Sequence, residues 1–129
     1  MLYTKFGNTG VTASRLGFGC MRFERPMDTD AMAEVVLHAF NRGITYFDTA
    51  PGYCDDQSEI IVGTAIKEIR KSVRPFFVST KTMAAEPDAI RRQCETSLKR
   101  LGVDAIDFYH VWCLVQPEDL PGRKRKGVL

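Results

Sequence analysis

Two ionisable side chains and one phenol stand at intervals that could support proton-transfer chemistry. Asp48 ends the apolar run 44–47, Tyr53 follows in a loop, and Lys81 ends the apolar run 76–80. Asp48 and Lys81 are 33 residues apart, so an acid and a base occupy equivalent places in two successive repeats and can meet across one strand gap. On spacing alone they could equally be a structural ion pair beside an ordinary loop tyrosine, because such pairs are common outside active sites.

The length and composition describe one ordinary folded domain. The chain has 129 residues, of which 44% are hydrophobic and 26% are charged, close to the average of globular proteins. Its formal net charge of +2 is too small to argue for a nucleic-acid partner or a membrane surface. No apolar run approaches the ~20 residues of a membrane helix, and the first residues show no signal-peptide pattern. We therefore expect a cytoplasmic protein.

Turn signals and apolar stripes divide the chain into a hairpin and a repeating strand–helix unit. Residues 3–15 predict a short hairpin, because two polar strands flank the turn sequence 7–10. A strand at 16–20 is followed by N-cap oxygens at 28–30 and by a helix that ends at Gly43. Five apolar residues are expected on one face of that helix: Met32, Val35, Val36, Ala39 and Phe40.

Two further strand–helix units and a fourth strand follow in the same order. Strands at 44–47 and 76–80 precede helices that begin near Ser58 and Pro87, and the fourth strand is expected at 105–111. The residues expected on the inner faces of these two helices are Ile61, Ala65, Ile69, Ile90, Cys94, Leu98 and Leu101.

Strands and helices that alternate in this way predict parallel strands joined by right-handed crossovers. Two architectures have this pattern, the doubly wound sheet and the eight-stranded barrel. The doubly wound sheet usually has a Gly-x-Gly-x-x-Gly turn after its first strand, and the sequence after Gly17-Phe18-Gly19 lacks the third glycine. We therefore predict an α/β fold of the (β/α)8 TIM barrel type, with the N-terminal β-hairpin plugging the bottom of the barrel.

A complete barrel needs about 250 residues, so this chain would supply only about the first four β/α units. We expect residues 1–129 to be the N-terminal half of a barrel, truncated after the fourth strand. Such a half would expose two sheet edges and an apolar interior, so it should form a homodimer or pair with a missing C-terminal half. In barrels of this type, catalytic residues lie at the carboxyl ends of the strands, where Asp48, Tyr53 and Lys81 are placed.

Four stretches of the sequence carry a family resemblance: Leu16-Gly17-Phe18-Gly19-Cys20-Met21; Gly43-Ile44-Thr45-Tyr46-Phe47-Asp48-Thr49-Ala50 with Tyr53 and Ser58-Glu59; Val78-Ser79-Thr80-Lys81; and Ser97-Leu98-Lys99-Arg100-Leu101-Gly102-Val103-Asp104 with Ile106-Asp107-Phe108-Tyr109. Each stretch alone is weak, but the four together have a specific order and spacing. Over essentially its whole length, the chain resembles the aldo-keto reductases.

The resemblance implies an NADPH-dependent oxidoreductase that reduces a small-molecule aldehyde or ketone to an alcohol. When hydride reaches the carbonyl carbon, negative charge grows on the oxygen, and a donor must supply a proton there. A tyrosine is a weak acid at neutral pH, and a nearby ammonium stabilises its anion. The resemblance therefore assigns Tyr53 as the general acid, Lys81 as its electrostatic activator and Asp48 as the residue that orients Lys81.

The resemblance is incomplete at the histidine that usually completes the catalytic tetrad. In the family that histidine usually stands five residues after the aspartate that is here Asp107, and this chain has Trp112 at that position. His110, two residues earlier, is the candidate for the fourth catalytic residue, with Trp112 as a substrate residue. The two side chains would share one face because strand residues alternate. Trp112 could face the substrate and donate its indole N–H, or it could be an apolar wall with His110 as a satisfied core residue.

Two loops add further expectations. Cys54 stands where the family commonly has glycine, and glycine tolerates a positive φ that cysteine does not, so the position of Tyr53 could shift. By resemblance, Cys20, Met21 and Arg22 could contact the cofactor, NADPH (NADP), while most of its site would lie beyond this chain.

Several weaker signals receive ordinary interpretations. The four cysteines form no Cys-x-x-Cys pair and are expected as free thiols, and no metal site is predicted from Cys20, Cys54, His110 and Cys113 because they match no standard ligand motif. The basic run 123–126 is expected as a solvated loop. Because a fold does not fix a function, the rival to the reductase is a non-catalytic half-barrel fragment, or an interaction or regulatory protein on the same fold.

Overall fold

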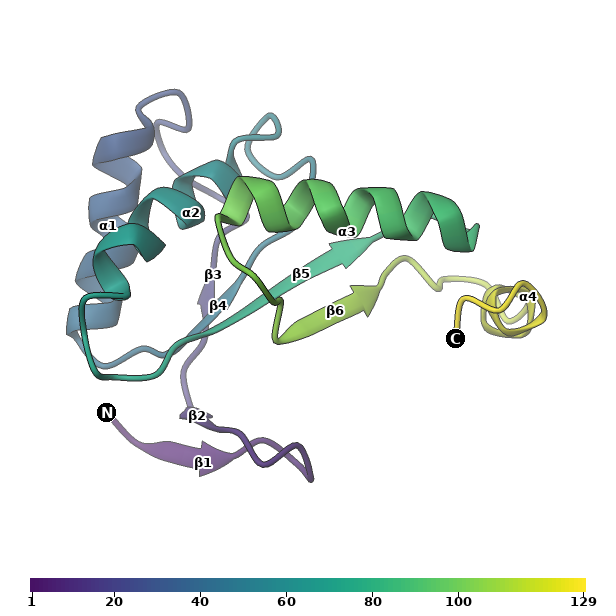
Figure 1. Ribbon diagram of the computed structural model, residues 1–129, viewed down its shortest axis with the longest axis horizontal. Helices are drawn as coiled ribbons and strands as arrows, with labels where there is room; N and C mark the ends of the chain where they lie inside the picture. Colours follow the sequence, from purple (N-terminus) through teal and green to yellow (C-terminus); the bar gives the residue numbers. More distant parts are fainter.

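A computed structural model describes residues 1–129 as a four-stranded parallel sheet with three long helices packed along it (Figure 1). The strands lie in sequence order as β3 (Phe18–Gly19), β4 (Tyr46–Asp48), β5 (Phe77–Thr82) and β6 (Phe108–Val111). Helices α1 (Thr29–Asn41), α2 (Ser58–Ile69) and α3 (Pro87–Leu101) each follow one strand. The predicted alternation of parallel strands and helices is confirmed. None of the helices combines the length and the apolar character needed to cross a membrane.

Helix α1 begins and ends where its sequence signals predict, but its buried face is rotated slightly from the predicted one. The Asp28 carboxylate accepts a hydrogen bond from the backbone N–H of Ala31 at 3.2 Å, which satisfies a free donor of the first turn. The buried stripe is centred on Val36, so Ala33 falls inside it and Val35 falls outside. The prediction that Val35 belongs to the core is therefore wrong.

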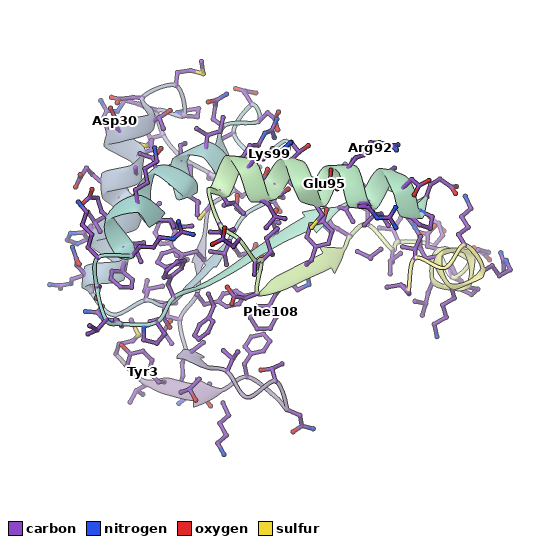
Figure 2. The ribbon with its side chains drawn as sticks, in the orientation of Figure 1. Tyr3, Asp30, Arg92, Glu95, Lys99 and Phe108 are labelled. Atoms are coloured by element: carbon purple, nitrogen blue, oxygen red, sulfur yellow. The ribbon has the colours of Figure 1, made fainter.

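Helix α3 packs one face on the sheet and shows a charged face to solvent. Arg92, Glu95 and Lys99 are exposed along its outer side (Figure 2). The apolar residues predicted on its inner side are Ile90, Cys94 and Leu98, which are half-buried, and Leu101, which is fully buried.

Aromatic rings attach the N-terminal hairpin to the amino end of the sheet. Its strands β1 (Tyr3–Lys5) and β2 (Thr12–Ser14) pair antiparallel. The ring of Phe6 lies 5.6 Å from that of Tyr46 and 4.7 Å from that of Phe108, which are the first residues of β4 and β6. Figure 2 shows Phe108 facing the hairpin. The hairpin therefore lies at the predicted bottom, opposite the strand ends that carry the candidate chemistry.

Side chains alternate along β5 between two faces of the sheet. Val78 and Thr80 point to the helices and are buried there. Ser79 and Lys81 point to the other face, where both contact Asp48. The candidate acid–base residues therefore lie on the face that forms the interior of a closed barrel. The carboxyl ends of the strands on this face, with the loops that follow them, are called the rim below.

The C-terminal segment corrects one prediction. Residues 119–125 form helix α4 (Asp119–Arg125), so the basic run 123–126 lies in a helix and at its C-cap, and not in a loop. The Asp119 carboxylate accepts the backbone N–H groups of Val115 and Gln116 at 2.8 Å each, which stabilises the turn before the helix. Arg123 donates to the carbonyl of Met83 at 3.0 Å, which attaches the helix to the loop after β5.

Helices α2 and α3 approach each other closely at Gly63. A Cβ atom on Gly63 would lie 2.3 Å from the carbonyl oxygen of Arg100 and 2.9 Å from the Cα of Leu101. Both are backbone atoms that cannot rotate away, so a larger residue must push the helices apart. We expect Gly63→Ala to lower the free energy of unfolding by about 1–3 kcal/mol, the usual cost of overpacking, in urea titrations followed by circular dichroism.

Gly122→Ala is the matched control. Gly122 also lies in a helix, and a Cβ there would meet nothing within 4 Å. Alanine favours the helix more than glycine does, so this change should leave stability equal or raise it by about 0.5–1 kcal/mol. Equal unfolding midpoints for Gly63→Ala and the wild type would show that the close contact does not limit stability.

Candidate active site

Asp48 and Lys81 form an ion pair at the rim. The Nζ atom of Lys81 donates to Oδ2 of Asp48 at 2.7 Å and to the carbonyl oxygen of Thr49 at 2.8 Å. The hydroxyl of Ser79 donates to Oδ1 of Asp48 at 2.5 Å. The Lys81 side chain is only 12% exposed. Because two of the three ammonium hydrogens point at these oxygens, the position of the positive charge is closely defined.

Tyr53 places its ring against this ammonium. The Nζ atom of Lys81 lies 4.9 Å from the centre of the Tyr53 ring, a cation–π distance, and it contacts the ring without donating to the hydroxyl. A positive charge there stabilises negative charge that develops on the phenol oxygen when its proton leaves. The structure thus brings together the three residues that the sequence singles out, and their catalytic roles stay a prediction.

Trp112 follows β6 directly and also contacts Tyr53. The two ring centroids are 5.9 Å apart with an interplanar angle of 83°, an edge-to-face contact. His110 is paired in register with Lys81, but its side chain is exposed. His110 is therefore not a buried core residue in this chain, which was one of the two alternatives. Which of His110 and Trp112 serves a substrate stays a prediction.

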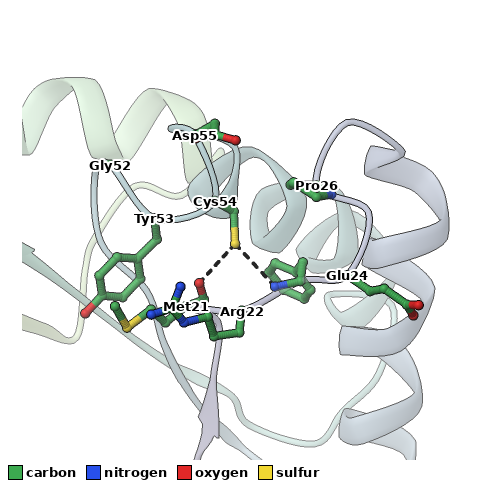
Figure 3. Close-up of a pocket in the computed structure, with 9 residues that line it drawn as sticks. Met21, Arg22, Glu24, Pro26, Gly52, Tyr53, Cys54 and Asp55 are labelled. Atoms are coloured by element: carbon green, nitrogen blue, oxygen red, sulfur yellow. Dashed lines mark hydrogen bonds between the residues drawn. The ribbon is translucent and has the colours of Figure 1, made fainter.

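A cavity of about 500 Å³ opens beside Tyr53, between the loop after β3 and the loop after β4 (Figure 3). The Cys54 thiol joins these two loops, because it accepts the Phe23 N–H at 3.3 Å and donates to the Met21 carbonyl at 3.1 Å. The volume suits a small organic molecule. The residues that line it are Met21, Arg22, Phe23, Glu24, Pro26, Gly52, Tyr53, Cys54 and Asp55.

Cys54 adopts a backbone conformation that favours glycine. Its φ is 55°, in the left-handed region. The expectation that a cysteine here avoids a positive φ is wrong, and the Tyr53 ring still reaches Lys81. The two hydrogen bonds of the thiol help to offset the cost of this conformation.

Buried hydroxyls attach the start of α2 to two strand ends. The Oγ atom of Ser58 donates to the carbonyl oxygen of Cys20 and lies 2.7 Å from the Oγ1 of Thr49. Both hydroxyl residues are fully buried. They fix the point at which the Tyr53 loop enters the helix, because Ser58 is the first residue of α2.

Known proteins are similar to this chain in sequence and in fold. The model of the aldo/keto reductase family matches residues 15–118. The chain belongs to the aldo/keto reductase family. It is 39% identical to the aldo-keto reductase YhdN of Bacillus subtilis (strain 168), in an alignment that covers 86% of this chain and 38% of that protein.

Solved aldo-keto reductases have the same fold. The holo form of an aldo-keto reductase from Bacillus halodurans matches with a TM-score of 0.77 and 26% identity, over 99% of this chain and 48% of that one. An aldo/keto reductase from Klebsiella pneumoniae, in complex with NADP and acetate, matches with a TM-score of 0.65 and 27% identity, over 78% of this chain and 35% of that one. The chain thus spans about half or less of the length of these family members. The predicted fold class, a part of a TIM barrel, is confirmed.

The family resemblance implies that three residues after the first strand contact the cofactor. These residues differ in their exposure in the structure. Met21 and Arg22 are exposed and line the cavity beside Tyr53. Cys20 is 1% exposed, and its thiol packs in the core with Val62 and Val78. The Cys20 side chain turns toward the helices, and the contact of residues 20–22 with a cofactor stays a prediction.

Further residues that contribute to the site of this aldo/keto reductase chain have weak sequence signals or none. Ser79 holds Asp48, and its signal is its place two residues before Lys81, which puts both on one face of β5. Asp56 and Arg100 form an ion pair across 44 residues, and no local pattern would reveal it. All four cysteines are free, and no cluster of three or more His, Cys, Asp or Glu side chains is placed to hold a metal ion.

Burial raises the pKa of the Cys20 thiol, and the negative charge of Asp48 acts in the same direction. Cys20 therefore stays protonated, and the protonated thiol is the unreactive form. We expect iodoacetamide to alkylate the exposed Cys113 of the folded protein and to spare Cys20, even near pH 8.5, where about half of an ordinary thiol is ionised. Mass spectrometry of tryptic peptides before and after unfolding measures this. Equal rates at Cys20 and Cys113 in the folded protein would contradict the packing.

Proposed function

We propose that this chain carries the proton-donating side of a carbonyl reductase that uses NADPH and acts on an aldehyde or ketone. The observation that supports it most is the contact between Tyr53 and Lys81, whose ammonium Asp48 holds in place. Membership of the aldo/keto reductase family supports the class of reaction. The product would be the corresponding alcohol.

In the proposed reaction, the Tyr53 hydroxyl donates a proton to the carbonyl oxygen as negative charge grows there. Lys81 stabilises the phenolate that remains, since its ammonium lies against the ring. Asp48 and the Thr49 carbonyl keep that ammonium from moving into solvent. Trp112 holds the phenol from its edge.

The side chains at the rim fit the nicotinamide end of the cofactor, which supplies the hydride when it is bound. The Asp48 side chain is 34% exposed and offers an acceptor for sugar hydroxyls. Met21 offers exposed apolar surface near Tyr53 (Figure 3), and the Arg22 guanidinium suits a phosphate. The NADP bound to the Klebsiella pneumoniae relative supports the choice of NADPH.

A second candidate function is a non-catalytic interaction or regulatory role on the same fold. The observation that favours it is that β3 and β6 each have a neighbouring strand on one side only. Such edges can pair with a second copy of the chain or with further strands. Titration of the purified chain with NADPH, followed by cofactor fluorescence, separates the two functions. Saturable binding favours the reductase, whereas a chain that binds no NADPH does not form the cofactor site alone and cannot act as a reductase by itself.

Removal of one hydroxyl tests proton donation. Tyr53→Phe keeps the ring that contacts Lys81 and Trp112 but has no proton to give, so we expect kcat for a generic aldehyde to fall by about 10²–10⁴-fold. NADPH binding should change little. Tyr46→Phe is the matched control, because Tyr46 stacks on Phe6 at the far end of the sheet. Wild-type turnover in Tyr53→Phe would exclude Tyr53 as the acid.

The indole and the imidazole are compared in a second pair of variants. Trp112→Phe keeps an aromatic edge against Tyr53 and loses the indole N–H, whereas His110→Ala removes an exposed side chain. If Trp112 donates to the substrate, Trp112→Phe should lower kcat/KM by about 5–10-fold, the value of one hydrogen bond. Steady-state kinetics on folded variants measures both. A larger loss in His110→Ala would make the histidine the fourth member of the site.

A further inference from the structure

Three consecutive residues after Tyr53 have left-handed backbone conformations. The φ angle is 55° at Cys54, 53° at Asp55 and 67° at Asp56. None of them is glycine, and the Cβ of any other residue is crowded in this region. A run of this kind persists only where the surrounding contacts hold it. The backbone that leads from Tyr53 into α2 therefore depends on its side-chain contacts.

Asp56 makes the strongest of these contacts. Its carboxylate receives two parallel hydrogen bonds from the Arg100 guanidinium on α3, each 2.6 Å long. Its Oδ1 atom also accepts the backbone N–H of Gly52 at 3.1 Å. Tyr53 lies directly after Gly52, so one carboxylate closes the loop that carries the phenol and attaches it to a helix.

Arg100 is itself held by a buried carboxylate and by close backbone packing. Its Nη1 atom lies 3.5 Å from Oε2 of Glu59, a side chain that is 1% exposed. The other oxygen of Glu59 accepts the buried hydroxyl of Thr80 on β5 at 2.7 Å. The backbone carbonyl of Arg100 lies against Gly63 on α2. A connected path of packed and hydrogen-bonded atoms thus runs from β5 and α2 through Arg100 to the loop.

We propose that Arg100 is a positioning residue for Tyr53, and that it acts by holding Asp56. This inference rests on the proposed role of Tyr53 as the acid. Without the two parallel hydrogen bonds, the left-handed run relaxes and the Tyr53 ring moves away from Lys81 and Trp112. A displacement of about 1 Å at a reacting group can lower a rate by about 10²-fold.

The geometry separates this pair from an ordinary surface ion pair. The Asp56 side chain is 49% exposed, so water competes for its charge, but the planar guanidinium fork matches the carboxylate with two bonds, which a single-bonded surface pair does not have. The hydrogen bonds from Arg100 hold the pKa of Asp56 below its ordinary value, and the same bonds raise the pKa of Arg100. Both groups are therefore charged at neutral pH. A lysine at position 100 would keep the charge but lose the fork.

The single tryptophan of the chain reports where Tyr53 lies. Trp112 contacts the Tyr53 ring, so loss of that contact opens the indole to solvent. The full chain is compared with Arg100→Lys and Asp56→Asn by acrylamide quenching of Trp112 fluorescence and by hydrogen exchange in peptides that cover 49–57. We expect the quenching constant to rise by about twofold in both variants, as a half-buried indole becomes exposed. Exchange in the loop should also be faster.

Turnover gives a third readout where the chain is active. Arg100→Lys should lower kcat by about 10–100-fold with little change in KM for the aldehyde, because the position of the acid is affected and substrate binding is not. The combined variant with Asp56→Asn should lose less than the product of the two single losses, since both substitutions weaken the same pair. Arg91→Gln is the matched control, because Arg91 lies on the same helix and pairs with Asp88 without touching the loop.

The outcomes separate this inference from the proposed function. Unchanged quenching and exchange in folded Arg100→Lys and Asp56→Asn overturn the positioning role, even if Tyr53→Phe abolishes turnover. If quenching and exchange both change but turnover does not depend on the Tyr53 hydroxyl, Arg100 still positions the loop, and the proposed function is overturned instead. If Arg100→Lys fails to fold, Asp56→Asn decides, because asparagine tolerates the left-handed conformation.

Discussion

The position of one ammonium group, that of Lys81, is the constraint on which the rest of the rim depends. A partly buried charge must replace its lost hydration, and here a carboxylate, a backbone carbonyl and the face of a phenol do so. All three partners come from the end of β4 or from the loop that follows it. The parallel register, in which Asp48 stands opposite Ser79, therefore decides whether the charge meets the phenol. A slip of one residue would turn Lys81 toward the helices.

The two ends of the sheet are stabilised by different interactions. At the amino end, aromatic rings of the hairpin, β4 and β6 pack on one another. At the rim, hydrogen bonds and ion pairs position the side chains, and two loops enclose a cavity. Apolar packing tolerates small displacements, whereas proton transfer does not. This division allows the rim to be polar and strained while the other end contributes stability.

Much of the fold could be predicted from the sequence, because apolar periodicity and turn residues are local signals. The strand–helix alternation, the Asp28 cap and the grouping of Asp48, Tyr53 and Lys81 are of this kind. The misses have physical causes. Helix α4 has a short polar sequence without an apolar stripe, and Val35 depends on the rotation of α1 against its neighbours. The burial of Cys20 and the pairing of Asp56 with Arg100 arise from tertiary contacts that no local pattern encodes.

The close contact at Gly63 couples position 63, which sets the helix spacing, to position 100, whose side chain holds a loop. The carbonyl of Arg100 touches Gly63, and the guanidinium of the same residue holds the loop of Tyr53. A larger residue at position 63 would move the backbone from which that guanidinium extends. A change at position 63 therefore also affects the task of the side chain at position 100. A lineage that enlarges the first must find another way to hold the loop, and a lineage that keeps the arginine is expected to keep the glycine.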